Sequence, residues 1–252
     1  MSGPFAGRLA LVTGATSGIG KATAIRLVGG GARVIATGRR GDRLDALRAE
    51  LGERCTTAVL DMTETASVKA FADALEETPD ELVNNAGLAL GVSGADEAQL
   101  EDWDRMIDTN VRGLVHLTRA LLPRMKPLER ADVINISSVA GSYPYPGGNV
   151  YGATKAFVTQ FSLNLRADLI GSRVRVTSVE PGLTETEFSE VRLHGDRTKA
   201  ADIYRGTDNL TGEDIARVIG DILALPPHIN INRVEVMPVC QAFSPFAIAR
   251  ET

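Results

Sequence analysis

Short apolar runs alternate along this chain with longer segments whose apolar residues recur at helical spacing. The first run, Leu9-Ala10-Leu11-Val12, leads directly into a glycine-rich segment, and a helical pattern then continues from Lys21 to Val28. Short apolar runs bounded by turn residues are typical of buried strands, whereas apolar residues three and four apart indicate a helix. The pattern therefore predicts a strand, a tight turn and a helix at the start of the chain.

The same alternation continues to the end of the sequence. Further strands are predicted at 34–36, 57–60, 82–83, 133–136, 174–179 and 233–236, and further helices at 42–51, 65–76, 103–125, from Tyr151 onward and at 213–223. The segment between the strand at 174–179 and the helix at 213–223 is predicted to be rich in loops. Strands separated by helices indicate repeated βαβ units and a parallel sheet covered on both faces. We therefore predict a single α/β domain with a doubly wound parallel sheet.

Composition and charge exclude several classes of function. The 252 residues are 44% hydrophobic and 23% charged, and the net charge of −5 gives no general attraction to nucleic acid or to an anionic membrane surface. No apolar stretch reaches the ~18 residues of a membrane helix, and the N-terminus lacks a signal-peptide pattern. Cys55 and Cys240 form no CxxC pair, so neither a disulfide framework nor a metal site is expected. We predict a cytoplasmic protein with no nucleic-acid or membrane partner.

Three glycines follow the first strand with the spacing GxxxGxG. They are Gly14, Gly18 and Gly20, and the helical pattern begins directly after them. Glycines permit a tight turn and close backbone approach, and amides at a helix N-terminus attract a pyrophosphate. Turn glycines are often only structural, but a strand before them and a helix after them favour a dinucleotide site.

The second strand ends in Thr37-Gly38-Arg39-Arg40, which contains no acid. An acidic residue here binds the 2′-hydroxyl of NAD, whereas arginine accommodates the 2′-phosphate of NADP. A solvated loop with chance basic residues is the alternative. We predict NADP(H) as the cofactor, and we expect Gly38→Asp, combined with a neutral residue in place of Arg39, to favour NADH.

Tyr151 and Lys155 are four residues apart in a predicted helix, so their side chains project from one face. An adjacent cation favours a phenolate and lowers the pKa of a tyrosine. Moving that pKa from about 10 to near 7 requires ~4 kcal/mol, of which a lysine supplies part and a cationic cofactor ring more. The alternative is a tyrosine at the start of a helix and a lysine in solvent.

Other polar residues occur at the predicted strand ends and within a helix. Asn84-Asn85-Ala86-Gly87 follows the fourth strand, and Ser137-Ser138 follows the fifth, with Ser138 thirteen residues before Tyr151. Asn110 lies in a helical stretch, where a polar side chain points to helix distortion, surface exposure or a functional role.

Taken together, these residues resemble the short-chain dehydrogenase/reductase family over nearly the whole chain. The resemblance is carried by Thr13 to Gly20, Asn84 to Gly87, Asn110, Ser138, Tyr151, Lys155 and Pro181-Gly182, in the family's order and approximate spacing. It implies that Tyr151 is the general acid-base and that Lys155 lowers its pKa and holds the nicotinamide ribose. It also implies that Ser138 orients the substrate oxygen and that Asn110 supports a proton-relay water.

The resemblance further implies a Rossmann-like domain over 1–252, with dinucleotide binding mainly in 8–137 and the catalytic and substrate region mainly in 138–252. A homo-oligomer, either a tetramer or a dimer, is expected. The implied contacts of NADP(H) are Gly14, Thr16, Ser17, Gly18, Ile19, Gly20, Arg39, Arg40, Asp61, Met62, Asn85, Ala86, Gly87, Tyr151, Lys155, Pro181, Gly182 and Thr184.

A narrower resemblance is to the NADP-dependent 3-hydroxy acid dehydrogenase branch. It is carried by 147–157, by Glu180-Pro181-Gly182 with Thr186-Glu187-Phe188-Ser189, and by 228–232. It implies a small substrate such as serine, allo-threonine or 3-hydroxypropionate, held by Ser138, Tyr145, Asn149 and Arg192, with Arg192 as the candidate cation for the carboxylate. An exposed loop arginine is the alternative for Arg192.

The stretch 237–246 begins as that branch does but continues with two phenylalanines and a proline, and it is a candidate to pack against a neighbouring chain or to cover a site. Two other functions remain open. One is a reductase for an uncharged or bulkier ketone, and the other is a non-catalytic NADP-binding sensor.

Overall fold

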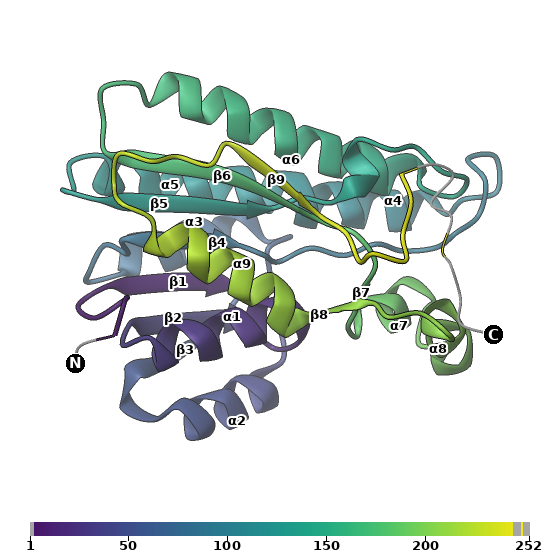
Figure 1. The fold of residues 1–252 in the computed structure, drawn as a ribbon, viewed down its shortest axis with the longest axis horizontal. Coiled ribbons are helices and arrows are strands. Elements are labelled where there is room, and N and C mark those ends of the chain that lie inside the picture. The colour runs from purple at the N-terminus through teal and green to yellow at the C-terminus, as the bar shows by residue number, and fades with distance from the viewer. Residues whose placement is uncertain (1–2, 244–247, 249–252) are drawn as a thin grey trace.

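The computed structural model describes residues 3–243 and 248. Its centre is a parallel sheet of seven strands in the order β3-β2-β1-β4-β5-β6-β9 (Figure 1). The strands are β1 (Leu9–Thr13), β2 (Arg33–Gly38), β3 (Cys55–Val59), β4 (Glu81–Asn84), β5 (Ala131–Ile136), β6 (Val174–Pro181) and β9 (Arg233–Val236). The prediction of a single doubly wound α/β domain is confirmed.

Helices cover both faces of the sheet. On one face lie α1 (Gly18–Gly29), α2 (Gly41–Leu51) and α9 (Gly212–Ala224), and on the other lie α3 (Thr65–Ala74), α5 (Leu114–Met125) and α6 (Asn149–Asp168), with α4 (Leu100–Ile107) packed beside α6. Alternate residues of β1 serve the two layers, since Ala10 and Val12 face the first and Leu11 the second. Within the described residues, no helix is both long and apolar enough to span a membrane.

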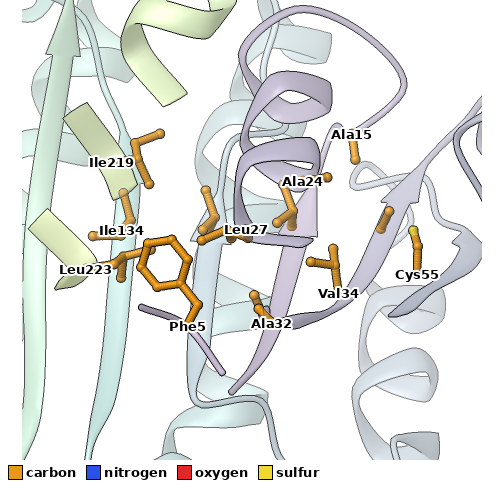
Figure 2. Close-up of a cluster of buried hydrophobic side chains, with 14 of the residues drawn as sticks. Phe5, Ala15, Ala24, Leu27, Ala32, Val34, Cys55, Ile134, Ile219 and Leu223 are labelled. Carbon is orange, nitrogen blue, oxygen red and sulfur yellow. The ribbon is translucent and has the colours of Figure 1, made fainter. Parts of the chain in front are cut away.

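The first layer is held by a dense apolar core (Figure 2). Leu27 of α1 and Ile219 of α9 are fully buried there with Ile134 of the sheet, and the ring of Phe5 closes the cluster beside Leu223. Fully burying one such side chain contributes ~1.5–3 kcal/mol. This core fixes α1, and therefore the glycine-rich turn before it, against the sheet.

The helices predicted over 103–125 are joined by an irregular turn. A π-helical turn, η2 (Asp108–Gly113), separates α4 from α5, and the side chain of Asn110 in this turn is only 1% exposed. The helix distortion expected at Asn110 is therefore present, and the alternative of surface exposure is wrong. The last residue of the turn, Gly113, leaves no room for a side chain, because a Cβ there would lie 2.3 Å from the carbonyl oxygen of Met62.

The segment after β6 contains more regular structure than the loop predicted from the sequence. It forms β7 (Thr184–Glu185), α7 (Phe188–Arg192), α8 (Arg197–Tyr204) and β8 (Leu210–Thr211), with β7 paired to β8. Short 3₁₀ turns also occur at η1 (Gly52–Arg54) and η3 (Val139–Gly141). The four elements from β7 to β8 are too short to show a hydrophobic period, and local contacts such as the Ser189 to Tyr204 hydrogen bond hold them in place.

The C-terminal stretch returns to the carboxyl end of β6. The side-chain oxygen of Gln241 accepts a hydrogen bond from the Leu183 amide (2.7 Å), and the Phe243 ring lies 5.3 Å from that of Tyr143. Of the residues named for this stretch from the sequence, Ser244, Pro245 and Phe246 lie outside the described residues.

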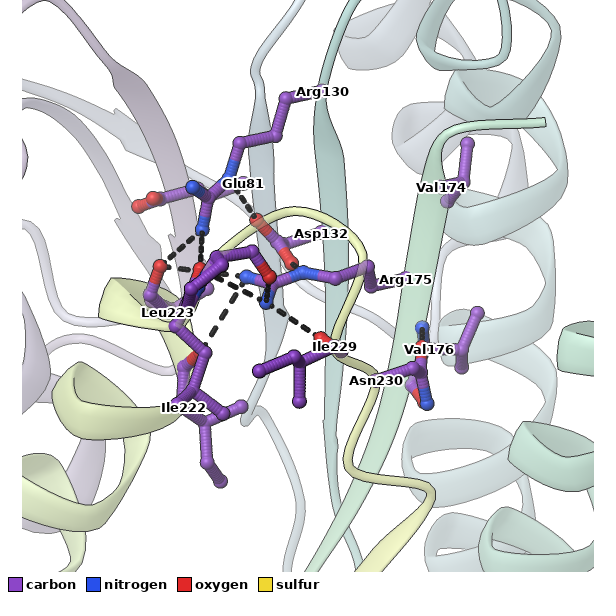
Figure 3. Close-up of polar contacts among 12 residues, drawn as sticks. Glu81, Arg130, Asp132, Val174, Arg175, Val176, Ile222, Leu223, Ile229 and Asn230 are labelled. Atoms are coloured by element: carbon purple, nitrogen blue, oxygen red, sulfur yellow. Dashed lines mark hydrogen bonds and ion pairs between the residues drawn. The ribbon is translucent and has the colours of Figure 1, made fainter.

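Buried charges lie across neighbouring strands at the amino end of the sheet (Figure 3). Glu81 of β4, Asp132 of β5 and Arg175 of β6 are paired in register. The Arg175 Nε donates to Asp132 (2.5 Å), and its terminal nitrogens reach five backbone carbonyl oxygens at and beyond the end of α9, including that of Ile229 (2.9 Å). This cluster ties the C-terminal end of α9 to the sheet, at the end opposite the cavity described next.

Candidate active site

A cavity of about 440 Å³ opens at the carboxyl ends of the strands. It lies between β1 and β4, where the strand order reverses: the chain continues from β1 to β2 in one direction and from β4 to β5 in the other. Doubly wound folds bind ligands at such a switch point. Its predicted lining residues are Gly14, Thr16, Ser17, Gly18, Ile19, Arg39, Arg40, Asp61, Met62, Asn85, Ala86, Gly87, Ser138, Tyr151, Lys155, Pro181, Gly182 and Thr184. The structure thus brings together all the predicted cofactor residues except Gly20.

The glycine-rich turn forms one wall of the cavity. Gly14 and Gly18 have left-handed backbone angles (φ +66° and +52°), which favour glycine. Gly20 does not line the cavity, and a Cβ there would lie 2.4 Å from the side-chain nitrogen of Asn85. That amide nitrogen donates to the Thr13 carbonyl oxygen (2.9 Å). Gly20 therefore allows close packing between the turn and the end of β4 and is not at the surface of the cavity.

The two predicted arginines occupy one end of the cavity. Arg40 donates to the hydroxyls of Thr16 (2.9 Å) and Ser17 (2.8 Å) and forms an ion pair with Glu187 (2.7 Å). Arg39 is exposed and has no carboxylate within 4 Å among the described residues. The guanidinium and hydroxyl groups together form a set of donors suited to a phosphate.

Three of the four predicted catalytic residues meet at the other end. Ser138 follows β5, and Tyr151 and Lys155 lie one turn apart in α6 with 8% and 5% of their surface exposed. Lys155 is not in solvent: its Nζ donates to the carbonyl oxygen of Ile136 (2.9 Å) and lies 5.8 Å from the centre of the Tyr151 ring. The alternative of an unremarkable surface pair is therefore wrong.

Burial dominates the protonation of this pair. It raises the pKa of Tyr151 to about 12, against the opposing effects of a hydrogen bond with Ser138 and the charge of Arg192. It also lowers the pKa of Lys155 to about 8. The Tyr151 and Lys155 spacing predicts a lowered tyrosine pKa, whereas the pKa of Tyr151 is raised, because desolvation penalises the phenolate more than its neighbours stabilise it.

Asn110 does not line the cavity. Its side-chain oxygen accepts from the Leu88 amide (2.9 Å), and its nitrogen donates to the Leu88 carbonyl (2.8 Å) and to the Thr154 hydroxyl (3.0 Å). These bonds tie the chain after β4 to α6, next to Lys155.

The predicted substrate residues divide between two places. The Arg192 guanidinium lies 5.8 Å from the ring centre of Tyr151 and 5.4 Å from that of Tyr145, but Arg192 lines a second cavity of about 230 Å³ next to the first. Asn149 also lines the second cavity, and its amide nitrogen donates to Ser93 (3.1 Å). Tyr145 and Asn149 are therefore not walls of the main cavity, and Arg192 lies at the boundary between the two.

Three residues of the site carry the sequence resemblance but were assigned no contact from the sequence, namely Thr13, Glu187 and Phe188. Phe188 of α7 covers Tyr151, with ring centres 5.6 Å apart, and Glu187 reaches the arginines. The hydroxyl oxygen of Thr13 accepts from the Asn85 and Ala86 amides (both 3.0 Å) and shapes the end of β4. The signal for Glu187 and Phe188 is the sequence Thr186-Glu187-Phe188-Ser189, which carries the narrower resemblance.

The residues that line the cavity fit a bound dinucleotide. The buried Thr109 hydroxyl lines it and has no hydrogen-bond partner within the described part of the chain. A Cβ at Gly14 would lie 2.9 Å from Ala86 Cα, so the backbone itself forms the surface there. Donors for a phosphate lie at one end and the buried tyrosine and lysine at the other.

A glycine-rich turn at the switch point of a doubly wound sheet defines the class of dinucleotide-binding α/β proteins. The sequence model of the short chain dehydrogenase family matches residues 8–196. The chain belongs to the short-chain dehydrogenase/reductase family, as its sequence motifs indicated.

Individual relatives are similar over almost their whole length. The chain is 54% identical over 246 residues to the NADP-dependent 3-hydroxy acid dehydrogenase YdfG of Salmonella typhi, covering 96% of this chain and 99% of the relative. It is 51% identical to the serine 3-dehydrogenase of Agrobacterium fabrum, covering 96% and 98%. Among solved structures, the closed form of serine dehydrogenase complexed with NADP+ superposes with a TM-score of 0.92 at 51% identity, covering 96% and 100%.

Proposed function

We propose that the protein is an NADP(H)-dependent dehydrogenase that interconverts a small 3-hydroxy acid, such as serine, allo-threonine or 3-hydroxypropionate, with the corresponding carbonyl compound. The observation that carries the proposal is the single cavity that joins the arginine and hydroxyl donors to Tyr151 and Lys155. The named activities of relatives that are half identical to this chain support the same reaction.

Tyr151 is the general acid-base. NADP(H), when bound, supplies or accepts the hydride at the reacting carbon. In reduction the Tyr151 phenol donates its proton to the carbonyl oxygen, and in oxidation the phenolate takes the proton of the hydroxyl. The Ser138 hydroxyl, which interacts with Tyr151 and lies at the cavity surface, orients the reacting oxygen.

Lys155 supports this proton transfer electrostatically. With a pKa of about 8 it is mainly charged at neutral pH, and its hydrogen bond to Ile136 fixes the ammonium beside the tyrosine. A fixed cation stabilises the phenolate that forms when the proton leaves. We assign Asn110 to positioning, because its amide holds the Leu88 backbone and Thr154.

The cofactor preference rests on Arg39 and Arg40. Both line the cavity, and Arg40 is already oriented by the hydroxyls of Thr16 and Ser17. A guanidinium offers a planar fork of donors that binds a charged phosphate more strongly than a neutral ribose hydroxyl. We therefore assign these residues to the 2′-phosphate of NADP(H).

Arg192 is the proposed cation for the substrate carboxylate. It lies next to Tyr151, and no carboxylate of the described residues is within 4 Å of it. A second candidate function is reduction of an uncharged ketone, which is favoured by the apolar wall that Leu88, Phe188 and Val191 give the main cavity.

We place the enzyme in the cytoplasm as a homo-oligomer, either a tetramer or a dimer. Both cysteines are free, which suits a reducing compartment. The ring of Phe157 is exposed on α6 and stacked on Phe161, with centres 5.9 Å apart, and this is an apolar surface for a second copy to cover.

The experiment that tests the substrate class is NADP reduction, followed at 340 nm, against a panel of 3-hydroxy acids and matched uncharged secondary alcohols. We expect turnover of the acids, with the alcohols at least tenfold poorer. A preference for uncharged alcohols would contradict the hydroxy-acid proposal and favour the ketone reductase.

A further inference from the structure

The segment that follows β7 closes over the main cavity through three contacts. Thr186 packs against the glycine-rich turn, where a Cβ at Gly18 would lie 3.1 Å from the Thr186 side chain. Phe188 covers the Tyr151 ring. Glu187, between them, points to the opposite end of the site, where the arginines lie.

Glu187 occupies the donors of two arginines at once. One carboxylate oxygen pairs with Arg40 (2.7 Å) and the other with Arg43, and the three side chains are about equally exposed, at 38–41%. Burial disfavours the charge of Glu187, but hydrogen bonds from Arg43 and Arg40 outweigh it and hold the pKa of this carboxyl below its ordinary value. The negatively charged carboxylate of Glu187 therefore lies at the arginine end of the cavity, beside the donors proposed to bind the 2′-phosphate.

We propose that Glu187 determines cofactor specificity by competing with the 2′-phosphate of NADP(H) for the guanidinium of Arg40. The inference rests on the proposed NADP(H) function and adds to it a residue that opposes the preference set by the arginines. Arg40 is already held by Thr16 and Ser17, so its remaining donors serve either the carboxylate or an incoming phosphate. Two anions at one guanidinium also repel each other.

The competition predicts a selective effect on ligands that carry a 2′-phosphate. A 2′-phosphate must displace Glu187 from Arg40, whereas a 2′-hydroxyl carries no charge and does not compete with the carboxylate for the guanidinium. Glu187 thus weakens NADP(H) binding and leaves NAD(H) binding unchanged. The difference in affinity between the two cofactors is smaller as a result. The half-exposed ion pair is weak enough to be exchanged for a doubly charged phosphate.

The test uses two probes that differ only in the 2′-phosphate, namely 2′,5′-ADP and 5′-AMP. Their dissociation constants are measured by titration calorimetry on the full chain, without substrate or turnover. The variants are Glu187→Gln, which removes the competing charge, and Glu190→Gln as a matched control. Glu190 lies in α7, which begins directly after Glu187, and it pairs with Arg197 rather than with Arg40.

We expect Glu187→Gln to tighten 2′,5′-ADP by roughly three- to tenfold, given the modest strength of half-exposed ion pairs. AMP should change by less than twofold, and Glu190→Gln should change neither probe. An unchanged or weakened affinity of Glu187→Gln for 2′,5′-ADP overturns the inference, as does an equal effect of Glu190→Gln.

Failure of the proposed cofactor is distinguishable from failure of the competition. If the unaltered protein binds 2′,5′-ADP no better than AMP, and Glu187→Gln then gains a preference for 2′,5′-ADP, the competition stands while the NADP(H) preference of the natural protein fails. If neither protein shows a preference, both proposals fail.

Discussion

Lys155 Nζ lies 5.8 Å from the centre of the Tyr151 ring while it donates a 2.9 Å hydrogen bond to the carbonyl oxygen of Ile136, the last residue of β5. The ammonium is therefore fixed to the sheet instead of moving freely with the helix surface. Burial lowers the pKa of Lys155 to about 8 and raises that of Tyr151 to about 12. The protein accordingly holds a protonated phenol beside a cation at neutral pH, which is the state needed to reduce a carbonyl.

The buried lysine has a consequence for stability. Its pKa of about 8 is below the ordinary lysine value of 10.5, so the unfolded chain binds more protons between these two values. The contribution of Lys155 to the free energy of unfolding therefore increases by about 3 kcal/mol as pH rises from 8 to 10.5. Below pH 8 this contribution does not change with pH.

Lys155→Met isolates this contribution. The difference in unfolding free energy, natural protein minus variant, should be flat at lower pH and should rise between pH 8 and 10.5 in urea denaturation. A difference that stays constant across this range would show that Lys155 titrates as an ordinary exposed lysine.

Arg192→Gln tests the carboxylate contact. Losing a hydrogen bond between charged groups costs about 1.5–3 kcal/mol, so KM for 3-hydroxypropionate should rise about tenfold to a hundredfold. Uncharged alcohols should be unaffected. Arg197→Gln is the matched control, because Arg197 is exposed and pairs only with Glu190 among the described carboxylates. Equal losses on acids and alcohols would assign Arg192 to packing against Tyr145 and Tyr151.

Arg39→Gln tests the cofactor end of the cavity. Removing this exposed guanidinium should weaken the binding of NADPH about tenfold and leave the binding of NADH unchanged, as measured by fluorescence quenching or titration calorimetry. Arg48→Gln, in the last turn of α2, is the control. The Gly38→Asp change expected from the sequence to favour NADH is unsuitable, because a Cβ at Gly38 would lie 2.6 Å from a methyl group of Thr16. Weakening of both cofactors alike would remove Arg39 from the phosphate site.

Arg175→Met tests the buried charges at the amino end of the sheet. The change leaves Asp132 with Arg130 as its cationic partner and leaves the carbonyls beyond α9 without the guanidinium. Breaking a buried pair costs about 3–5 kcal/mol, which should appear as a lower urea midpoint. The kcat of the folded variant should be unchanged, since the cluster and Tyr151 lie at opposite ends of the sheet. A reduced kcat at full folding would contradict this separation.

The sequence predicts the sheet and the polar centre of the site because both depend on short-range patterns. The apolar run Leu9 to Val12 and the glycines after it determine β1 and the turn, and the spacing of Tyr151 and Lys155 on one helix determines that they meet. The π-helical turn at Asn110 was visible only as an unexplained polar residue. The pairing of Glu187 with Arg40 has no sequence signal, because the two residues are 147 positions apart and are joined only by the fold.

The direction of the tyrosine pKa also required the structure. Neighbouring charge is legible in the sequence, but the depth of burial is not. At Tyr151 burial is the larger effect, and it reversed the expected direction.

The most direct test of the account is the rate of NADPH formation from L-serine and 3-hydroxypropionate by the natural protein and by Tyr151→Phe, with NADP and NAD in parallel. General acid-base catalysis contributes typically 10²–10⁴-fold. We expect turnover with NADP in preference to NAD and a loss of kcat of about that size in Tyr151→Phe, with the affinity for NADP retained. A Tyr151→Phe protein that turns over at the natural rate would contradict the proposed mechanism.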